Sequence, residues 1–295
     1  MLIGELFALA TAFLWAFTSI LFTDATRNLG TFMLNFMRLA LASILILLTI
    51  FIIDDFIIPN NYQLLMLSIS GVIGLIIGDT FLFKSYTLNG PRISSLIMSL
   101  NPAIGAIAAY YIFGENLSFW AILGIFLTIV GISIVTLTKK EDNQIFNPTK
   151  TGYAYALIAA ICQAFGLIFV RFAMNDSIIS PLMSTFIRNT AAAILFIPVL
   201  IIFKKWKNPI KLLKSNSKTI KSLLIGTIIG PYLGITFSLY AIAYTKIGIA
   251  SALMSTTPLL LLPLSVFYYN EKISKKSIIG AIIAVIGVVV LFLFN

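Results

Sequence analysis

The chain has 295 residues, of which 60% are hydrophobic and only 10% are charged, and its mean hydropathy is +1.04. A soluble domain carries about 25% charged residues, so most of this surface must face something other than water, and a polytopic membrane protein is expected. The net charge is +10, but the basic residues lie between apolar runs and are not interleaved with aromatic side chains, so nucleic-acid binding is not expected.

Two residue types limit the chemistry that the chain can perform. Cys162 is the single cysteine, so neither a disulfide framework nor a thiolate metal site can be built. No histidine occurs, which removes the commonest general base and the commonest ligand of transition metals. We therefore expect no metal, no cofactor and no catalytic residues.

The first apolar run begins at once and has Glu5 where a secretory signal would have Lys or Arg, so we expect a membrane helix and not a cleaved peptide. Runs of this kind recur along the chain, each about 20 residues long, which is enough to cross a hydrocarbon core of about 30 Å as a helix. Because the runs are continuous and not alternating, an all-α bundle is expected and not a β-barrel. The ten predicted spans are residues 2–22, 31–53, 62–83, 93–113, 118–138, 152–172, 181–203, 220–243, 247–269 and 275–294.

The second half of the chain repeats the first. A single ungapped shift of 156 residues places the third to fifth predicted helices on the eighth to tenth. A shift of 150 aligns the second with the seventh, and a shift of 148 aligns the first weakly with the sixth. The pairs matched at 156 include Gly74/Gly230, Gly78/Gly234, Thr80/Thr236, Phe81/Phe237, Ser95/Ser251, Met98/Met254, Pro102/Pro258, Glu115/Glu271, Gly124/Gly280 and Gly131/Gly287.

This repeat predicts the topology. Each half holds five helices, an odd number, so the second half enters the membrane from the opposite side and the halves are inverted repeats. Transporter folds are often built in this way, with the substrate site near the midplane at the repeat interface. We expect a first repeat at 1–138, a polar linker at 139–150 and a second repeat at 151–295.

Several short motifs carry a resemblance to a known family. They are FLWAFTSI (13–20), NFMRLA (35–40), and in each half P-(x)12-E-x-L/I-S followed by G-(x)6-G, from Pro102 to Gly131 and from Pro258 to Gly287. In their order and duplication they resemble the EamA-type family of the drug/metabolite transporter superfamily, over nearly the whole chain. The resemblance implies a ten-helix bundle that moves small metabolites by alternating access. That family handles amino acids, nucleotide sugars, drugs and other solutes, so the resemblance leaves the substrate open.

Matched prolines lie near the middle of two predicted spans. Pro102 and Pro258 should each kink a helix, because proline lacks an N–H and clashes with the carbonyl four residues earlier. The kinks either line a central cavity or only shape helix packing. The candidates for substrate contact at these two places are Met98, Asn101, Pro102, Met254, Thr257 and Pro258.

Other polar and small residues recur at mid-depth. Trp15 and Gln163 correspond under the repeat, and Tyr232 and Tyr240 lie in the eighth predicted helix. These four side chains either face the cavity or serve packing and lipid contact. Glycines that recur at spacings of three, four or seven residues predict close helix–helix packing.

Arginines occur at equivalent depths in the two halves. Arg38 and Arg188 each lie seven residues into a span, roughly 10 Å from the membrane surface at the rise of an α-helix. A charge at that depth is costly, so each should either find a partner or extend to the interface. The inverted repeat suggests two symmetric gates, Arg38 with Glu271 and Arg188 with Glu115, and the alternative is that the two glutamates are interfacial caps.

Asp79 is a third charge inside a predicted span. Its repeat counterpart is Ile235, so it does not follow the symmetry. It lies on the same side as Arg38 and is a rival partner for that arginine. As an acid in an apolar environment it is also the candidate for proton coupling.

The orientation of the chain in the membrane stays open at this stage. Lys and Arg gather in the odd-numbered loops, so the positive-inside rule places both termini outside. The family resemblance places both termini in the cytoplasm.

A multi-pass secondary transporter of the cell membrane, exporting amino acids or related metabolites, is the leading functional prediction. The alternatives are an intramembrane enzyme and a non-transporting receptor or scaffold. The expected partners are the lipid bilayer and a small-molecule substrate, with protons as a candidate coupling ion and a monomer or homodimer as the assembly. No P-loop occurs, so ATP-driven transport by this chain alone is not expected.

Overall fold

The computed structural model describes residues 2–53, 59–114, 116–138, 145–174, 179–213, 217–245 and 247–293, and every secondary-structure element in them is helical. The α-helices are α1 (Leu2–Leu29), α2 (Thr31–Ile53), α3 (Asn61–Ser70), α4 (Asp79–Met98), α5 (Asn101–Phe113), α6 (Phe119–Leu137), α7 (Lys150–Met174), α8 (Pro181–Ile202), α9 (Pro209–Leu213), α10 (Ser217–Thr227), α11 (Ile235–Tyr244), α12 (Ile247–Met254), α13 (Thr257–Tyr269) and α14 (Lys275–Leu293). Two π-helical segments, η1 (Gly71–Gly78) and η2 (Ile228–Gly234), join α3 to α4 and α10 to α11.

The prediction of an all-α membrane protein is confirmed. In the described part of the chain, seven helices are long and apolar enough to cross a membrane. The longest of them, Asn61–Met98, is bent at Gly90, whose φ of 79° and ψ of 161° are not helical. The bend lies between the third and fourth predicted spans. It is located at a glycine because glycine alone adopts this backbone conformation without strain.

At each of the two predicted proline kinks the α-helix is interrupted by a short turn and then restarts. α4 ends at Met98 and α5 begins at Asn101, and in the same way α12 ends at Met254 and α13 begins at Thr257. Each proline then lies in the first turn of the new helix, where its missing N–H has no cost. At the second break the Thr257 hydroxyl donates to the Met254 carbonyl over 2.7 Å, which satisfies a group that the break has freed.

The π-helical segments occupy corresponding places in the two halves, since a shift of 156 residues carries 72–78 onto 228–234. A π-helix forms i→i+5 hydrogen bonds and so disturbs the pairing of backbone carbonyls, and such segments are frequent at functional sites. The segments are rich in glycine, so side chains from neighbouring helices can approach the backbone closely.

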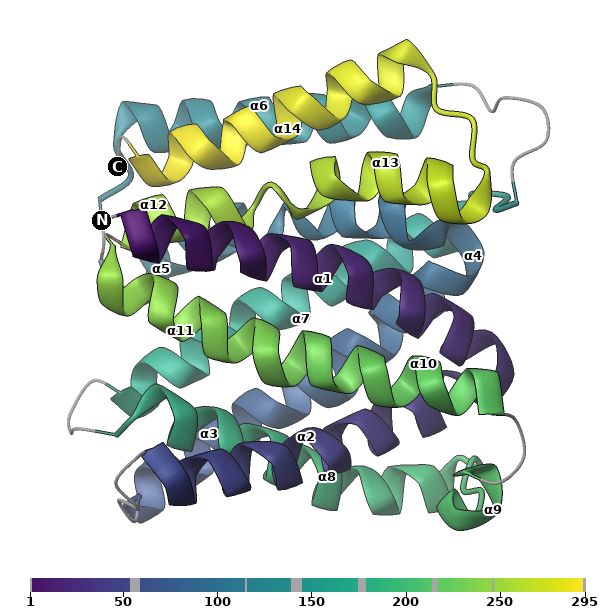
Figure 1. Cartoon of the computed structure of the whole chain (residues 1–295). Coiled ribbons are helices and arrows are strands. Elements are labelled where there is room, and N and C mark those ends of the chain that lie inside the picture. Colours follow the sequence, from purple (N-terminus) through teal and green to yellow (C-terminus); the bar gives the residue numbers. More distant parts are fainter. Residues whose placement is uncertain are drawn as a thin grey trace.

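The helices form a single bundle in which α1 begins and α14 ends at the same end (Figure 1). α1 packs along α10, η2 and α11, and α7 packs in the same way along α3, η1 and α4. Both pairings are antiparallel: Phe22 lies beside Gly226 while Trp15 lies beside Gly234, and Gln63 donates to the Ala173 carbonyl while Gly166 lies beside Gly74. The first helix of each half therefore packs in the same way on the other half, so this contact between the halves is made twice. We call the end opposite the start of α1 the distal end.

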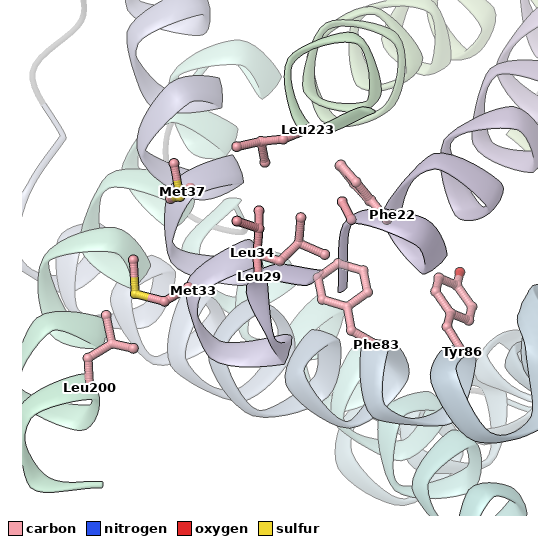
Figure 2. Packing of buried hydrophobic residues seen from close by; sticks show 10 residues of the cluster. Phe22, Leu29, Met33, Leu34, Met37, Phe83, Tyr86, Leu200 and Leu223 are labelled. Atoms are coloured by element: carbon pink, nitrogen blue, oxygen red, sulfur yellow. The ribbon is translucent and has the colours of Figure 1, made fainter. Parts of the chain in front are cut away.

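Two buried apolar clusters occupy opposite ends of the bundle. The first cluster, drawn in Figure 2, consists of Phe22, Ala25, Leu29, Met33, Leu34, Met37, Phe83, Tyr86, Leu200 and Leu223. The second cluster consists of Ala42, Ile46, Ile50, Leu67, Ala173, Ile179, Met183 and Ile187. The first cluster contains residues from the end of α1 and the beginning of α2, and the second contains residues from the end of α2. Since α1 ends at the distal end, the first cluster lies there. Met183 is the repeat counterpart of Met33, and Leu67 that of Leu223, which extends the repeat from sequence to packing.

Close backbone packing at the predicted glycines is confirmed where α6 meets α14. A Cβ on Gly124 would lie 2.6 Å from the Gly287 carbonyl oxygen, and one on Gly131 would lie 2.5 Å from that of Gly280. Because these neighbours are backbone atoms, neither can give way. The two helices run antiparallel, since 124 meets 287 and 131 meets 280.

Candidate functional site

Arg38 and Asp79 form a buried ion pair between α2 and the beginning of α4. The two residues are 7% and 6% exposed, and the guanidinium Nη2 bonds the carboxylate Oδ2. Arg38 Nε also donates to the Asn35 amide oxygen over 3.0 Å. The predicted pairing of Arg38 with Glu271 is therefore wrong and the rival partner Asp79 is right. The repeat symmetry suggested Glu271, but α4 lies beside α2 and brings its own acid to the arginine.

Side-chain amides connect this ion pair to the π-helical segment η1. Asn35 Nδ2 donates to the Leu75 carbonyl over 2.8 Å and to the Thr80 hydroxyl over 3.0 Å. Gln163 Nε2 donates to the Gly74 carbonyl over 3.2 Å and to Asp79 Oδ1 over 2.6 Å. Two helices outside η1 thus supply donors to its carbonyls. Asn35 was missed by the sequence reasoning, although its place three residues before Arg38 on one helix face was a usable signal.

Arg188, which lies on α8, also approaches η1. Its Nη2 is 3.4 Å from the position of a Cβ on Gly74, and its Nε is buried without a hydrogen-bond partner. Glu115, its proposed partner, lies outside the described residues, so that pairing stays a prediction. We call Arg38, Asp79, Gln163 and Arg188, grouped around η1, the central network.

A second buried ion pair lies at the distal end. Arg92 Nη2 and Nε donate to Glu271 Oε1 over 2.6 Å and 3.2 Å, and each residue is 5% exposed. Arg92 was missed as a site residue because it was counted with the loop bases. Its place directly after Pro91, at the start of a helical run, could have identified it. Its repeat counterpart is Gly248, so the repeat does not supply a second ion pair of this kind.

Further contacts join α1 to α13 beside this ion pair. Asp24 accepts hydrogen bonds from the Tyr268 and Tyr269 hydroxyls over 2.5 Å and 3.1 Å. The Phe146 ring packs on Tyr269 with 5.0 Å between ring centroids and lies 4.6 Å from the Arg27 guanidinium carbon. The distal end is therefore bridged by the ion pair, by the Asp24–tyrosine bonds and by Phe146.

The first cluster lies directly beside the central network. The guanidinium carbon of Arg38 is 5.0 Å from the centroid of the Phe83 ring and 5.9 Å from that of Phe22. Figure 2 shows both rings among the aliphatic side chains of α1, α2, α8 and α10. Apolar packing thus separates the charges of the central network from the distal end.

The other predicted site residues lie apart from the central network. The Tyr232 hydroxyl bonds Thr49 over 2.9 Å, and its ring packs on the second cluster. Tyr240 stacks on Phe7 and Tyr244. Trp15 Nε1 is 2.6 Å from the position of a Cβ on Gly234.

The residues at the two helix breaks are not brought to the network either. Pro258 is buried, and Met98, Asn101, Pro102, Met254 and Thr257 are half-buried. No hydrogen bond between described residues joins Asn101 or Thr257 to the central network. Over the same residues no group of three or more His, Cys, Asp or Glu side chains that could hold a metal ion occurs.

Comparison with known proteins agrees with this architecture. An uncharacterized transporter of Archaeoglobus fulgidus is 22% identical over 291 residues, which cover 98% of this chain and 97% of that protein. The uncharacterized transporter YetK of Bacillus subtilis is 39% identical over 80 residues, 27% of this chain and 24% of that protein. A WAT1-related chloroplastic protein of Arabidopsis thaliana is 23% identical over 214 residues, 70% of this chain and 50% of that protein.

The fold itself has been seen before. A protein of known crystal structure matches 99% of this chain and 96% of its own with a TM-score of 0.67 and 19% identity, a likeness that shows the fold alone. The model of the EamA-like transporter family matches twice in tandem, over residues 2–137 and 150–293. The chain belongs to the EamA-like transporter family.

Proposed function

We propose that this membrane transporter moves small organic solutes across the cell membrane by alternating access, with ten membrane helices arranged as two inverted repeats of five. Amino acids or related metabolites are the leading substrate class, and export is the leading direction. The observation that carries the proposal is the central network, in which four charged or amide side chains from both halves meet at a π-helical segment inside the bundle.

The duplicated packing supports the inverted repeat. The antiparallel contact of α1 with η2 recurs as that of α7 with η1, and counterpart residues fill apolar clusters at the two ends. Two similar halves related in this way can exchange conformations, which is how such folds open alternately to each side. The halves are those expected from the sequence, 1–138 and 151–295 on either side of the 139–150 linker.

The contacts at the distal end support a gate there. Arg92–Glu271, Asp24 with its two tyrosines and the first cluster all join helices at this end. For a substrate to pass, these contacts must separate. We therefore assign the structure to a state closed at the distal end.

Transport in liposomes tests the proposal. Purified full-length chain is reconstituted, and uptake and exchange of labelled amino acids, organic acids, amines and sugars are measured with and without a pH gradient. Flux of at least one solute above that in protein-free vesicles is expected, and its response to the gradient tests proton coupling through Asp79. Equal flux in both kinds of vesicle for every solute would refute transport. Protease access to a C-terminal tag in the same vesicles and in cells tests the orientation. If no solute is transported, the result favours the alternatives of a receptor or an intramembrane enzyme.

A further inference from the structure

Arg188 carries a positive charge inside the bundle that forms no ion pair with any described residue. Gly74, against which its Nη2 lies, is far from both ends of the helical run 61–89, so the guanidinium does not extend to the membrane surface. Its Nε is buried without a partner, and in the described ranges its side chain forms no hydrogen bond or ion pair. Since a guanidinium does not deprotonate in proteins, the charge persists.

Asp79 is the nearest acid, but it is already engaged. Arg38 holds its Oδ2 and Gln163 holds its Oδ1. The second half supplies no matching acid, because the counterpart of Asp79 is Ile235. The central network thus has two guanidinium groups for one carboxylate. Such an unbalanced charge in a membrane protein is costly and typically marks a substrate or ion pathway.

Gln163 presents an acceptor to the same place. Its Nε2 faces two acceptors, the Gly74 carbonyl and Asp79 Oδ1, which determines the orientation of the amide. Its Oε1 must then point away from them. This oxygen lies 3.5 Å from the position of a Cβ on Gly74, and Arg188 Nη2 lies 3.4 Å from the same position. A cation and an unused acceptor therefore converge on a residue without a side chain.

We propose that Arg188 and Gln163 bind an α-amino acid beside Gly74, with the substrate carboxylate on the guanidinium and its ammonium on Gln163 Oε1. This inference rests on the proposed transport function and assigns the residues that recognise its leading substrate class. The planar guanidinium matches a carboxylate with two parallel N–H···O bonds, and an amide oxygen accepts readily from an ammonium group. The carboxylate also balances the second guanidinium of the network.

Ligand analogues test the proposal on the unmodified protein. Binding of the twenty L-amino acids to the purified full-length chain is measured by thermal shift and equilibrium dialysis. The tightest ligand is then compared with its amide, its decarboxylated amine and its deaminated acid. We expect the amide and the amine to bind about ten- to a hundredfold more weakly, because a charge-assisted bidentate contact is lost, and the deaminated acid to lie between. Binding by none of the amino acids, or equal binding by acid and amide, would overturn the proposal.

Matched variants locate the site. Arg188→Gln should abolish the preference for the acid over the amide, while Arg188→Lys should keep part of it, since lysine retains the charge without the fork. Arg171→Gln, at an exposed arginine, is the control and should bind as the parent does. Gly74→Ala places a methyl group at ordinary contact distance from both groups and should weaken binding without unfolding the chain, in contrast to Gly105→Ala, where nothing lies within 4 Å.

The outcomes separate this inference from transport itself. If Arg188→Gln still prefers the acid over the amide as strongly as the parent does, the site assignment fails. If Arg188→Gln does not fold, the parent decides, and equal binding of acid and amide by the parent then refutes the assignment. If liposomes containing the chain carry only solutes without a carboxylate, the inference fails and transport stands. If amino acids bind through Arg188 but none crosses the liposome membrane, the site stands and the proposed transport fails.

Discussion

Gly131→Ala tests whether backbone contact between α6 and α14 holds the two halves together. The new Cβ would lie 2.5 Å from the Gly280 carbonyl oxygen and 2.7 Å from the Ala284 Cα. Carbon atoms in contact lie about 3.5–4.0 Å apart, so the helices must separate locally by about 1 Å, a gap that forfeits roughly a quarter to a half of each dispersion contact. Overpacking of this kind costs about 1–3 kcal/mol.

The assay is thermal unfolding of the purified chain in detergent. A loss of that size should lower the melting temperature by several degrees, on the order of 5 °C. Gly105→Ala is the matched control, because no atom lies within 4 Å of its added Cβ. Since alanine is the better helix former by about 1 kcal/mol, the control should melt at the parent temperature or slightly above it. Equal melting temperatures for the two variants would show that the α6–α14 contact is looser than the structure has it.

Three further predictions concern the charges and the bend. Arg92→Gln and Glu271→Gln should each destabilise the chain by about 3–5 kcal/mol, since each leaves one buried charge unpaired, and the double variant should cost less than their sum; additive losses in unfolding experiments would contradict the ion pair. Asp79→Asn should lower the melting temperature, because it leaves both arginines of the central network without an acid. It should also remove any response of transport to a pH gradient, because an amide cannot take up the proton; an undiminished pH response in liposomes would exclude Asp79 as the proton site. Gly90→Ala should cost about 1–3 kcal/mol, because its φ of 79° with ψ of 161° is a conformation that essentially only glycine adopts, and more because its Cβ would lie 2.8 Å from the Phe146 ring. Phe146→Ala in the same chain should recover the second part only, as melting temperatures of the parent, the two single variants and the double variant would show.

The helices and their pairing by repeat were readable from the sequence for local reasons. Continuous apolar runs of membrane length predict helices wherever they occur, and a fixed shift between two halves predicts duplicated contacts. Gly131 and Gly280 are examples. Each belongs to a pair of glycines seven residues apart, which predicted close packing, and a Cβ added to either would lie within 2.7 Å of the other's carbonyl oxygen. The breaks at Pro102 and Pro258 were predicted only as kinks, because sequence alone does not say whether a helix bends around a proline or restarts at it.

The site was less readable, because its partners break the repeat symmetry. Arg38 was assigned by symmetry to Glu271, yet Asp79 and Arg92, whose counterparts are Ile235 and Gly248, form the actual ion pairs. Gln163 was proposed for the cavity, but its bond to Asp79 depends on α7 lying against η1. A pairing between distant helices follows from which helices are neighbours, and that is a property of the whole bundle.

The sequence by itself determined that this chain is a helical membrane protein made of two related halves, because hydropathy and internal repetition are properties of the linear sequence. Only the tertiary structure decided that Asp79 neutralises Arg38 and that no described acid forms an ion pair with Arg188. It also decided which carbonyls of the π-helical segment η1 accept hydrogen bonds from side chains. Buried charges are costly unless paired, so their partners are selected by the packing that brings α2, α4, α7 and α8 together around Gly74.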